Sequence, residues 1–466
     1  MCLPYLFFLG VYLAWVLVGC TPPEAQTVWP EPRPLGRDLP VYQPPPLVPG
    51  EARLARDVRE PTGVMTLAQA QAVALVQNPR LAAFGWEVRA REAQILQARL
   101  LPNPEVDVEV ENFAGSGALR EFRSSEITIL LSQLIELGGK RRTRVRVAAL
   151  ESTLAAWDYE TTRIEVLTQV TQAFVEVLSA QERVRLNEDL VRLAEQGLNT
   201  VAERVRAGKV SPVEETRFQV TLSTSRIALE RAQRDLEATR KRLVTAWGGS
   251  TPTFTSAEGT LDTLSAIPPA ERLLELIAQN PEVARWATEM VQRQATLARE
   301  GAQRIPDPTL RGGFRHLSET GDNALVMGVS IPLPVFNRNQ GKVLEARYRL
   351  AKAGEERRAA EAQVRAALAE AYGALSRAFV EATRLHTEVL PGAQRVFDAV
   401  SEGYRQGKFG FLEVLDAQRT LFEARGRYLE ALAAYHQAVA EVERLIGERL
   451  SSVTDALGSQ PSGGKR

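Results

Sequence analysis

Glu413 and Asp416 are the side chains in this sequence with the clearest potential for chemistry. They lie three positions apart in the stretch Phe-Leu-Glu-Val-Leu-Asp, which has a helical pattern, so both fall on one face of a helix. A third carboxylate, Glu214, holds the position of Glu413 in a second copy of this segment, 199 residues upstream. Stacked carboxylates are a usual device for attracting cations. The alternative is that they are solvated acids at helix starts, where the helix dipole favours negative charge.

Nothing else in the chain suggests a reaction centre. There is no nucleophile elbow, phosphate loop or zinc-binding helix motif, so we expect no enzyme activity and no cofactor. His316, His386 and His436 are too scattered for a metal site and are interpreted as packing or surface residues, and both cysteines lie in the first twenty positions. Lysine and arginine together equal aspartate and glutamate, 57 each, so a nucleic-acid partner is not indicated.

The carboxylates lie beside a turn that occurs twice. Glycine ends one helix, and in the first copy serine and proline start the next, so each copy is the tip of a helical hairpin. The tips are Gly208, Lys209, Val210, Ser211 and Pro212 in the first copy, and Gly407, Lys408, Phe409, Gly410 and Phe411 in the second. The chain therefore consists of two copies of one long unit.

Long helices must position these tips. Helices are predicted from about residue 140 to 207 and from about 340 to 406, each roughly 100 Å long at 1.5 Å per residue. The return helices end near Gly248 and Gly447 and carry a seven-residue repeat of apolar and small residues, which indicates a coiled-coil seam. Shorter helices, the first from Thr66 to about Leu100, would stack end to end on the return helices. Asn78-Pro79 and Asn280-Pro281 interrupt them.

Each repeat also contains a pair of strands. Val106, Val108 and Val110 alternate with acidic residues, and return strands are predicted at 127–132 and 325–331. The polar residues of the first strands share one face: Asp107, Glu109 and Glu111 in the first repeat, and Arg311 and Arg315 in the second. Two hairpins cannot close a barrel or bury a core, so several chains are required.

The N-terminal region predicts export. An apolar run ends in Leu17-Val-Gly-Cys20, which resembles a bacterial lipobox, so residues 1–19 form a lipoprotein signal peptide and Cys20 carries the lipid. An uncleaved anchor helix is the alternative. A proline-rich tether follows at 20–65, then the first repeat at 66–248, a linker at 249–267, the second repeat at 268–447 and a disordered tail at 448–466.

This layout resembles the outer membrane efflux protein family, typified by TolC. The most specific segment is Tyr404 to Asp416 with the following Ala-Gln and Thr-Leu. The segments Gln133-Leu-Ile-Glu-Leu-Gly-Gly-Lys-Arg141 and Ser330-Ile-Pro-Leu-Pro-Val-Phe-Asn-Arg-Asn-Gln-Gly341 are similar to the CzcC branch, which serves heavy-metal efflux. The resemblance covers roughly residues 66 to 447.

The resemblance implies a mainly α fold in which three chains share a twelve-stranded β-barrel, four strands each, and a helical periplasmic tunnel. The barrel would lie in the outer membrane of a Gram-negative-type bacterium, with the acidic and arginine face toward the lumen. Tyr404, Glu214, Glu413 and Asp416 would form the periplasmic gate, and the family has a basic residue where this chain has Phe409.

The implied partners are two further copies of the chain, outer-membrane lipid, a periplasmic membrane-fusion adaptor that contacts the tips, and an inner-membrane pump of the resistance-nodulation-division (RND) type. Phe409 and Phe411 are expected to be exposed for this contact, although packing within the trimer is the alternative. The function implied is a passive duct for heavy-metal cations. Efflux of drugs or organic solvents, type I secretion, and a lipid-anchored scaffold without a pore remain the alternatives.

Overall fold

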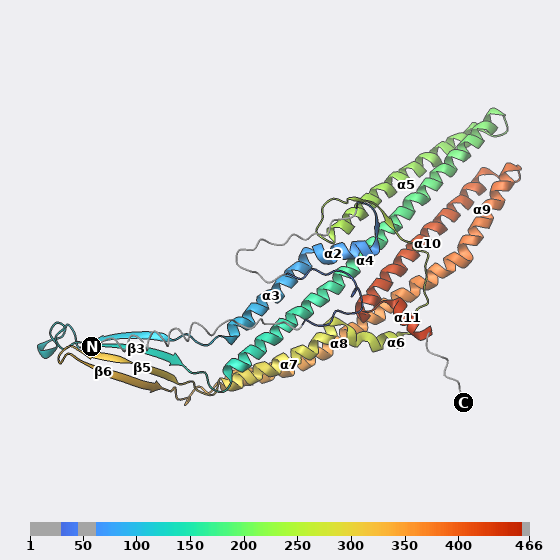
Figure 1. Cartoon of the computed structure of the whole chain (residues 1–466). Helices are drawn as coiled ribbons and strands as arrows, with labels where there is room; N and C mark the ends of the chain where they lie inside the picture. The colour runs from blue at the N-terminus through green and yellow to red at the C-terminus, as the bar shows by residue number, and fades with distance from the viewer. Residues whose placement is uncertain (1–28, 45–61, 459–466) are drawn as a thin grey trace, which may run out of the picture. The chain divides into compact units, whose positions relative to one another are not determined.

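The computed structural model describes residues 29–44 and 62–458, and Figure 1 shows the ribbon. Residues 1–28, which include the predicted signal peptide and lipidated Cys20, lie outside the described residues. The chain divides into two compact units: the first includes residues 87–156 and 286–356, and the second includes residues 30–86, 157–285 and 357–466. The first unit carries the main sheet, and the second carries both hairpin tips.

The elements follow the predicted order in both repeats. The helices are α2 (Leu67–Gln77), α3 (Pro79–Arg99), α4 (Lys140–Arg206), α5 (Pro212–Thr245), α6 (Ala270–Leu276), α7 (Pro281–Ala302), α8 (Gln340–Arg384), α9 (Leu390–Arg405), α10 (Phe411–Ile446) and α11 (Leu450–Gly458). Short turns of other helix types are η1 (Gly117–Leu119), η2 (Ile277–Gln279) and η3 (Leu385–Val389). The strands are β1 (Gly63–Thr66), β2 (Glu105–Glu111), β3 (Glu126–Leu134), β4 (Phe254–Glu258), β5 (Thr309–Leu317) and β6 (Asp322–Ser330).

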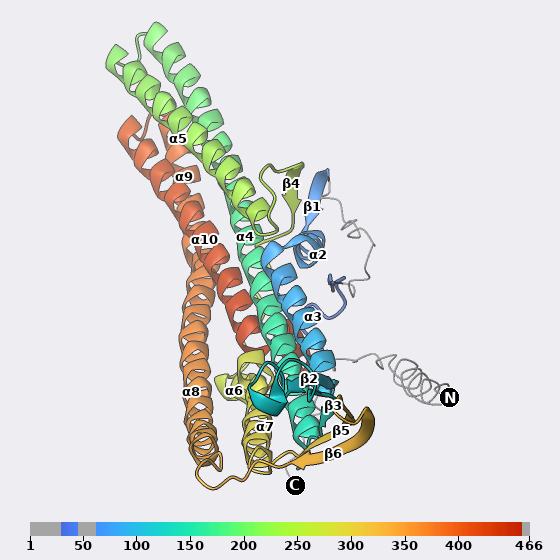
Figure 2. The ribbon, with the colours of Figure 1, turned by 90° about the vertical axis from the view of Figure 1, so that its left-hand side faces the viewer.

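Two helical hairpins dominate the second unit. Helices α4 and α5 run side by side to one tip, and α9 and α10 run side by side to the other (Figures 1 and 2). The predicted seam of the second return helix is confirmed, because Leu421, Tyr435 and Val442 are at most 2% exposed and the interleaved alanines are buried. Small residues at these positions let neighbouring helices approach closely, so the seam supplies the core.

One asparagine in each repeat joins a short helix to a return helix. Asn78 accepts a hydrogen bond from the Leu81 backbone N–H (2.9 Å) and donates from Nδ2 to the carbonyl of Ala246 (2.6 Å). Asn280 accepts from the Glu282 N–H (2.8 Å) and donates to the carbonyl of Leu445 (3.0 Å). A side-chain oxygen that caps a helix start satisfies an otherwise unpaired donor. The predicted end-to-end stacking is therefore confirmed in both repeats.

The second long helix is helical throughout 340–405, as predicted, but its middle is not α-helical. A π-helical turn, η3, separates α8 from α9 just before Pro391. Proline has no N–H to donate, and its ring clashes with the carbonyl four residues earlier, here that of Thr387. The wider turn accommodates this clash, and the first repeat has no proline at the matching position.

The segments predicted as tether and linker contain paired strands. Within the predicted tether, β1 pairs in parallel with β4, which lies in the predicted linker. Their inward residues Met65 and Phe254 are at most 3% exposed. Residues 29–44 also pack against the second unit. Leu35 is buried, and its N–H donates to the carbonyl of Gly447 (3.1 Å). Part of the proline-rich segment is thus integral to the second unit.

The predicted disordered tail is wrong for residues 450–458, which form α11. Leu450 and Val453 are 3% and 5% exposed and pack in a core cluster with residues of α6, α8 and α10. The Leu450 N–H also donates to a Glu443 carboxylate oxygen at 2.9 Å. Two apolar side chains one turn apart are enough to fix this short helix.

The main sheet has the strand order β2-β3-β5-β6, with every neighbouring pair antiparallel. The two predicted hairpins are confirmed, with longer strands than expected, and they join through β3 and β5. Strands β2 and β6 are the two edges. Among the described helices, we find none with an apolar stretch long enough to span a membrane.

Candidate functional site: hairpin tips and the polar face of the sheet

Both tips end their first helix in the same way. Gly208 and Gly407 have φ angles of +67° and +76°, a conformation that glycine adopts without steric cost. In each copy the next residue donates its N–H to the carbonyl five residues earlier: Lys209 to Arg204 at 2.9 Å, and Lys408 to Gly403 at 2.8 Å. This Schellman arrangement closes the helix C-terminus. Ser211 then caps α5 through its hydroxyl oxygen, with Pro212 in the first turn, as predicted.

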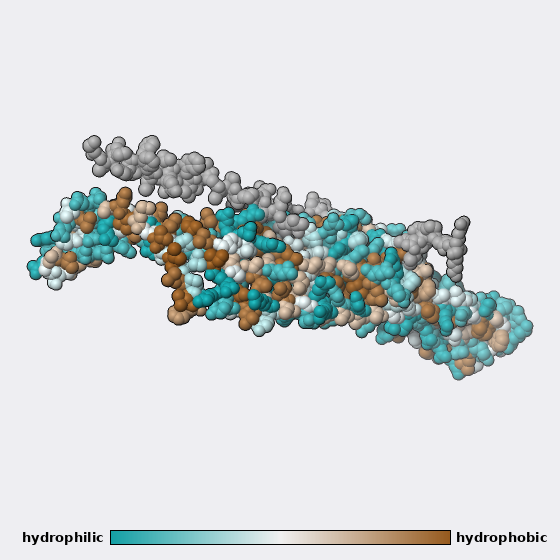
Figure 3. Space-filling view, turned by 90° about the horizontal axis from the view of Figure 1, so that it is seen from below, coloured by the Kyte–Doolittle hydropathy of each residue, from teal (hydrophilic) through white to brown (hydrophobic). Residues whose placement is uncertain are grey.

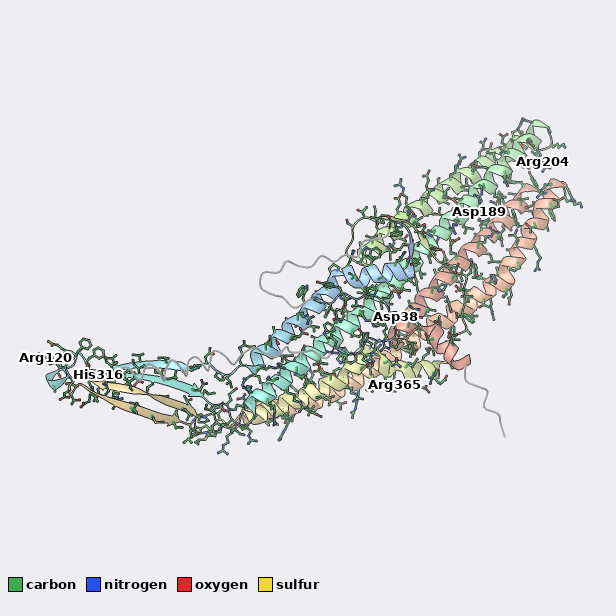
Figure 4. All side chains as sticks on the ribbon, viewed as in Figure 1. Asp38, Arg120, Asp189, Arg204, His316 and Arg365 are labelled. Atoms are coloured by element: carbon green, nitrogen blue, oxygen red, sulfur yellow. The ribbon has the colours of Figure 1, made fainter. Side chains whose placement is uncertain are left out.

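Tyr404 lies at the centre of the second unit's tip region. It is 8% exposed and packs in an apolar cluster with Val201, Phe218 and Phe411. The Arg204 guanidinium lies 4.6 Å from the centroid of the Tyr404 ring and donates to its carbonyl oxygen at 3.4 Å. Such cation–π contacts are favourable when the cation is partly desolvated. The cluster joins the ends of α4 and α9, which come from different repeats. Arg204 lies at the tip end of α4 (Figure 4).

Three polar atoms in this region are buried without a hydrogen bond of good geometry among the described residues: the Tyr404 hydroxyl, Glu214 Oε2 and the Ser401 hydroxyl. Burial raises the pKa of Tyr404, the Arg204 cation opposes that rise, and the Glu214 carboxylate adds to it. Glu214 is therefore near Tyr404, as expected if both serve one site. Buried polar atoms without hydrogen bonds are costly, so the burial of the Tyr404 hydroxyl and Glu214 Oε2 opposes the stability of the tip.

Glu413 and Asp416 are both exposed and lie one turn apart in the start of α10. The structure therefore places them on one face but not in the Tyr404 cluster. Asp416 accepts a hydrogen bond from Arg419 at 2.8 Å, and Arg419 Nε is also 3.9 Å from Glu423. The sequence interpretation missed this arginine, which partly neutralises Asp416 within the single chain.

The expectation that Phe411 is exposed is wrong. Phe411 is 3% exposed, and its ring centroid is 4.2 Å from that of Phe218 in the other hairpin. Phe409 is 46% exposed and lies over Gly403, where a side chain would clash with its ring. The position of Phe409 and Phe411 in a turn did not predict which ring is buried. Phe218, which packs against Phe411, is almost 200 residues away in the sequence. Phe409 is thus the aromatic residue of this tip that is available for contact.

The predicted polar face of the sheet is confirmed as a single face. In the strand register, Glu109 of β2 lies opposite Thr128 of β3, and Thr128 lies opposite Arg315 of β5. Ser132 of β3 likewise lies opposite Arg311 of β5. Residues directly opposite in a sheet share a face, so the acidic series and both arginines lie together. Arg315 binds Glu126 at 2.8 Å and lies 3.6 Å from Glu111. The other face carries Val106, Val108, Val110, Leu310 and Phe314, all at least 40% exposed.

The structure gives the three histidines ordinary contacts. His316 bonds Asn323 at 3.0 Å, His386 stacks on Tyr428, and His436 Nε2 lies 2.8 Å from the Leu261 carbonyl oxygen. Among the described residues, no group of three or more histidine, cysteine, aspartate or glutamate side chains has the geometry to hold a metal ion. Arg204, like Arg419, is a residue near the tips that the sequence did not reveal. Arg204 lies in the repeated segment, but the matching residue of the second copy is Gly403. The internal repeat therefore gave no signal for this arginine.

A groove of about 690 Å³ lies between the two hairpins, near the tips. It is lined by residues of α4, α5 and α10, among them Leu186, Val220, Leu412, Asp416 and Phe422. Val220 and Leu412 are both more than 60% exposed. The groove therefore places apolar surface beside the Asp416–Arg419 pair.

CzcC, a cobalt-zinc-cadmium resistance protein of Cupriavidus metallidurans, is 38% identical over 389 residues, which cover 84% of this chain and 91% of that protein. NccC, a nickel-cobalt-cadmium resistance protein of Alcaligenes xylosoxydans xylosoxydans, is 26% identical, covering 63% and 68%. Among solved structures, CusC has a TM-score of 0.68 at 17% identity, covering 88% of this chain and 99% of CusC. The open state of the Neisseria gonorrhoeae MtrE channel also has a TM-score of 0.68, at 18% identity, covering 88% and 98%.

These findings confirm the predicted fold class, mainly helical with a smaller sheet in two repeats, and the predicted outer-membrane location. The family and its relatives are channel and transport proteins. The family model matches residues 72–249 and 273–448, most of both repeats. The chain belongs to the outer membrane efflux protein family.

Proposed function

We propose that this protein is the outer-membrane duct of a tripartite system that exports heavy-metal cations. The identity of 38% to CzcC along nearly the whole of both chains is the observation that carries the proposal. The relatives named for pyoverdine export and toluene efflux are 25% and 24% identical over smaller parts of this chain. The duct is passive, and a periplasmic adaptor and an inner-membrane RND pump supply the cargo and the energy.

The proposed assembly is a homotrimer. The sheet has two unpaired edges, β2 and β6, which present rows of free backbone donors and acceptors. Three four-stranded sheets joined edge to edge satisfy those groups in one closed twelve-stranded sheet. Its apolar face, with Val108 62% and Leu325 89% exposed, then meets lipid, and the face with Asp107, Glu109, Glu111, Arg311 and Arg315 lines the lumen.

The periplasmic gate is proposed at the tips, where Tyr404 and Glu214 lie close together and each has a buried oxygen without a hydrogen bond of good geometry among the described residues. Glu413 and Asp416 provide exposed carboxylates on the same hairpin, and three copies form an acidic ring. The adaptor contacts the tip residues 208–212 and 407–411, with Phe409 as the exposed aromatic anchor.

A complementation experiment tests the cargo. The chain is expressed with its own pump and adaptor in a bacterium that lacks its native efflux ducts, and growth is measured in zinc, cobalt, cadmium and toluene. We expect restored tolerance to the metal ions and unchanged sensitivity to toluene. Tolerance restored only to toluene would show an organic-solvent duct. Lack of complementation by a chain shown to be inserted in the outer membrane would contradict the export role.

A further inference from the structure

Two segments that sequence comparison singled out meet where the sheet of the first unit joins its helices. They are Gln133–Arg141 and Ser330–Gly341, and both connect a strand to a long helix. The connection before β5 joins them: the Ile135 N–H donates to the Pro308 carbonyl (2.9 Å), and Lys140 binds Asp307 at 2.6 Å. Asn339 Nδ2 donates to the Glu300 carbonyl at 2.9 Å. We call these residues together the junction.

The strand side of the junction exposes a large amount of apolar surface. Leu333 is 79% exposed, Phe336 is 91% exposed, and seven neighbouring apolar side chains are between 37% and 61% exposed. Those seven are Leu100, Leu101, Ile135, Leu137, Ile305, Ile331 and Val335. Figure 3 shows hydrophobic surface gathered in this part of the first unit. A contiguous apolar patch of this kind marks a site of interaction with a membrane or another protein.

The helix side of the junction has an excess of positive charge. Its four carboxylates are each engaged by a nearby cation: Glu136 by Arg144, Glu300 by Arg299, Asp307 by Lys140, and Glu345 by Arg349. Four further arginines are exposed and have no ion pair among the residues that the structure describes: Arg141, Arg142, Arg304 and Arg338. Arg338 Nε donates only to the Pro334 carbonyl, at 3.1 Å, which holds it against the exposed apolar loop. The N-terminus of α4 adds further positive potential beside Arg141 and Arg142.

Apolar side chains next to unpaired arginines match one kind of partner. An anionic phospholipid presents acyl chains and a phosphate a few ångströms apart, in the same order as the two halves of the junction. Arginine suits phosphate because its planar guanidinium donates two parallel hydrogen bonds. Continuation of the apolar patch into the exposed apolar face of the sheet also favours lipid over a soluble protein, since that face is the one proposed to lie in the membrane.

We infer that Arg141, Arg142, Arg304 and Arg338, with the apolar loop around Phe336, form a binding site for anionic phospholipid in the periplasmic leaflet of the outer membrane. This inference rests on the proposed placement of the sheet in the membrane. The site fixes the depth at which the sheet sits, because acyl chains contact the strand side and headgroups contact the helix side. It also makes stability of the assembled protein depend on lipid charge.

The experiment uses the full chain purified in detergent, with dioleoyl phosphatidylglycerol as the anionic probe and dioleoyl phosphatidylcholine as the neutral one. Bound lipid is counted by native mass spectrometry, and the thermal midpoint is followed during lipid addition. We expect preferential retention of phosphatidylglycerol that weakens with salt. The fourfold variant Arg141→Gln, Arg142→Gln, Arg304→Gln, Arg338→Gln should lose on the order of several hundredfold in affinity, given roughly fivefold per cation.

A matched control removes four exposed cations of α5 that also lack ion pairs among the described residues: Arg217→Gln, Arg231→Gln, Arg234→Gln and Lys241→Gln. It should retain phosphatidylglycerol as the unmodified protein does. If the fourfold junction variant does not fold, the pairs Arg141/Arg142 and Arg304/Arg338 are tested separately, and each pair should lose about 25-fold in affinity.

Three results would overturn the site. They are equal retention of the two lipids by the unmodified protein, equal losses in the junction and control variants, and displacement of phosphatidylglycerol by millimolar inorganic phosphate. The last would show a site for free phosphate. Metal tolerance in the complementation experiment is a separate readout, so failure of the lipid site and failure of the export role are distinguishable.

Discussion

Arg163 and Glu160, one turn apart on α4, form an ion pair that is almost completely buried. Two guanidinium nitrogens of Arg163 donate to the two Glu160 oxygens at 2.8 and 2.7 Å, and the side chains are 2% and 5% exposed. The pair also holds the N-terminal segment. Arg163 donates to the carbonyls of Leu35 and Gly36, and Glu160 accepts from the Arg33 N–H at 2.7 Å. The segment that follows the predicted lipid anchor is thus attached at a buried charge pair.

The first prediction concerns this attachment. Arg163→Met leaves the Glu160 carboxylate buried without its cation, which costs about 3–5 kcal/mol in the free energy of unfolding. We expect a much lower thermal midpoint in detergent and protease cleavage near residue 36. The control is Arg192→Met, which breaks the exposed Arg192–Asp189 pair of the same helix and should cost about 1 kcal/mol or less. Equal effects of the two substitutions would show that burial of the pair is unimportant.

The second prediction concerns the two asparagines that join helices end to end. Asn78→Ala and Asn280→Ala each remove a helix cap and a hydrogen bond to a return-helix carbonyl, so each should cost roughly 1–3 kcal/mol. Asn78→Asp keeps the acceptor for the Leu81 N–H but loses the donor to Ala246. Its stability, measured by thermal denaturation, should therefore fall between those of the unmodified protein and Asn78→Ala. An aspartate variant as stable as the unmodified protein would show that the bond to Ala246 contributes nothing.

The third prediction concerns pH. Burial raises the pKa of Glu443, although the Leu450 N–H and the Arg449 charge oppose the rise. A carboxyl group with a raised pKa contributes stability that is fully present below its unfolded pKa of about 4.3 and is lost as pH rises through its folded pKa. Glu443→Gln, which can still accept from Leu450, should be more stable than the unmodified protein at pH 7, and the difference should shrink toward pH 4. A difference independent of pH would contradict this assignment.

Local patterns predicted most of the architecture. The alternation around Val108 predicted the strands and their faces, because its signal lies within a few residues. The internal repeat predicted both tips, because it copies a short local segment. The parallel pairing of β1 with β4 joins strands of four and five residues that are about 190 positions apart, and such short strands give no periodic signal. Pro391 was visible in the sequence, but only its effect on the carbonyl of Thr387 makes the π-helical turn necessary.

The candidate site was predicted less completely, for a related reason. Residue type and spacing identified Tyr404, Glu214, Glu413 and Asp416, but not which of them lie together. The inward position of Phe411 depends on Phe218, and the environment of Tyr404 depends on Arg204, and both partners come from the other hairpin. Contacts between the repeats are set by packing of whole helices, so no single segment encodes them.

The last prediction concerns the proposed acidic ring at the tips. Glu413→Gln with Asp416→Asn removes two exposed carboxylates, so cation selectivity and block by divalent cations in a planar bilayer should weaken. Arg419→Gln should act in the opposite direction, because it frees Asp416 from its partner at 2.8 Å and increases the negative charge of the ring. Tyr404→Phe should instead raise the resting conductance, since it removes a buried hydroxyl of the closed state without changing the charge. The control, Glu230→Gln with Asp235→Asn, removes the same charge from exposed positions on α5 and should leave the current unchanged. If the tip and control variants give the same selectivity and block, these carboxylates are solvated residues at a helix start and the pore is controlled elsewhere.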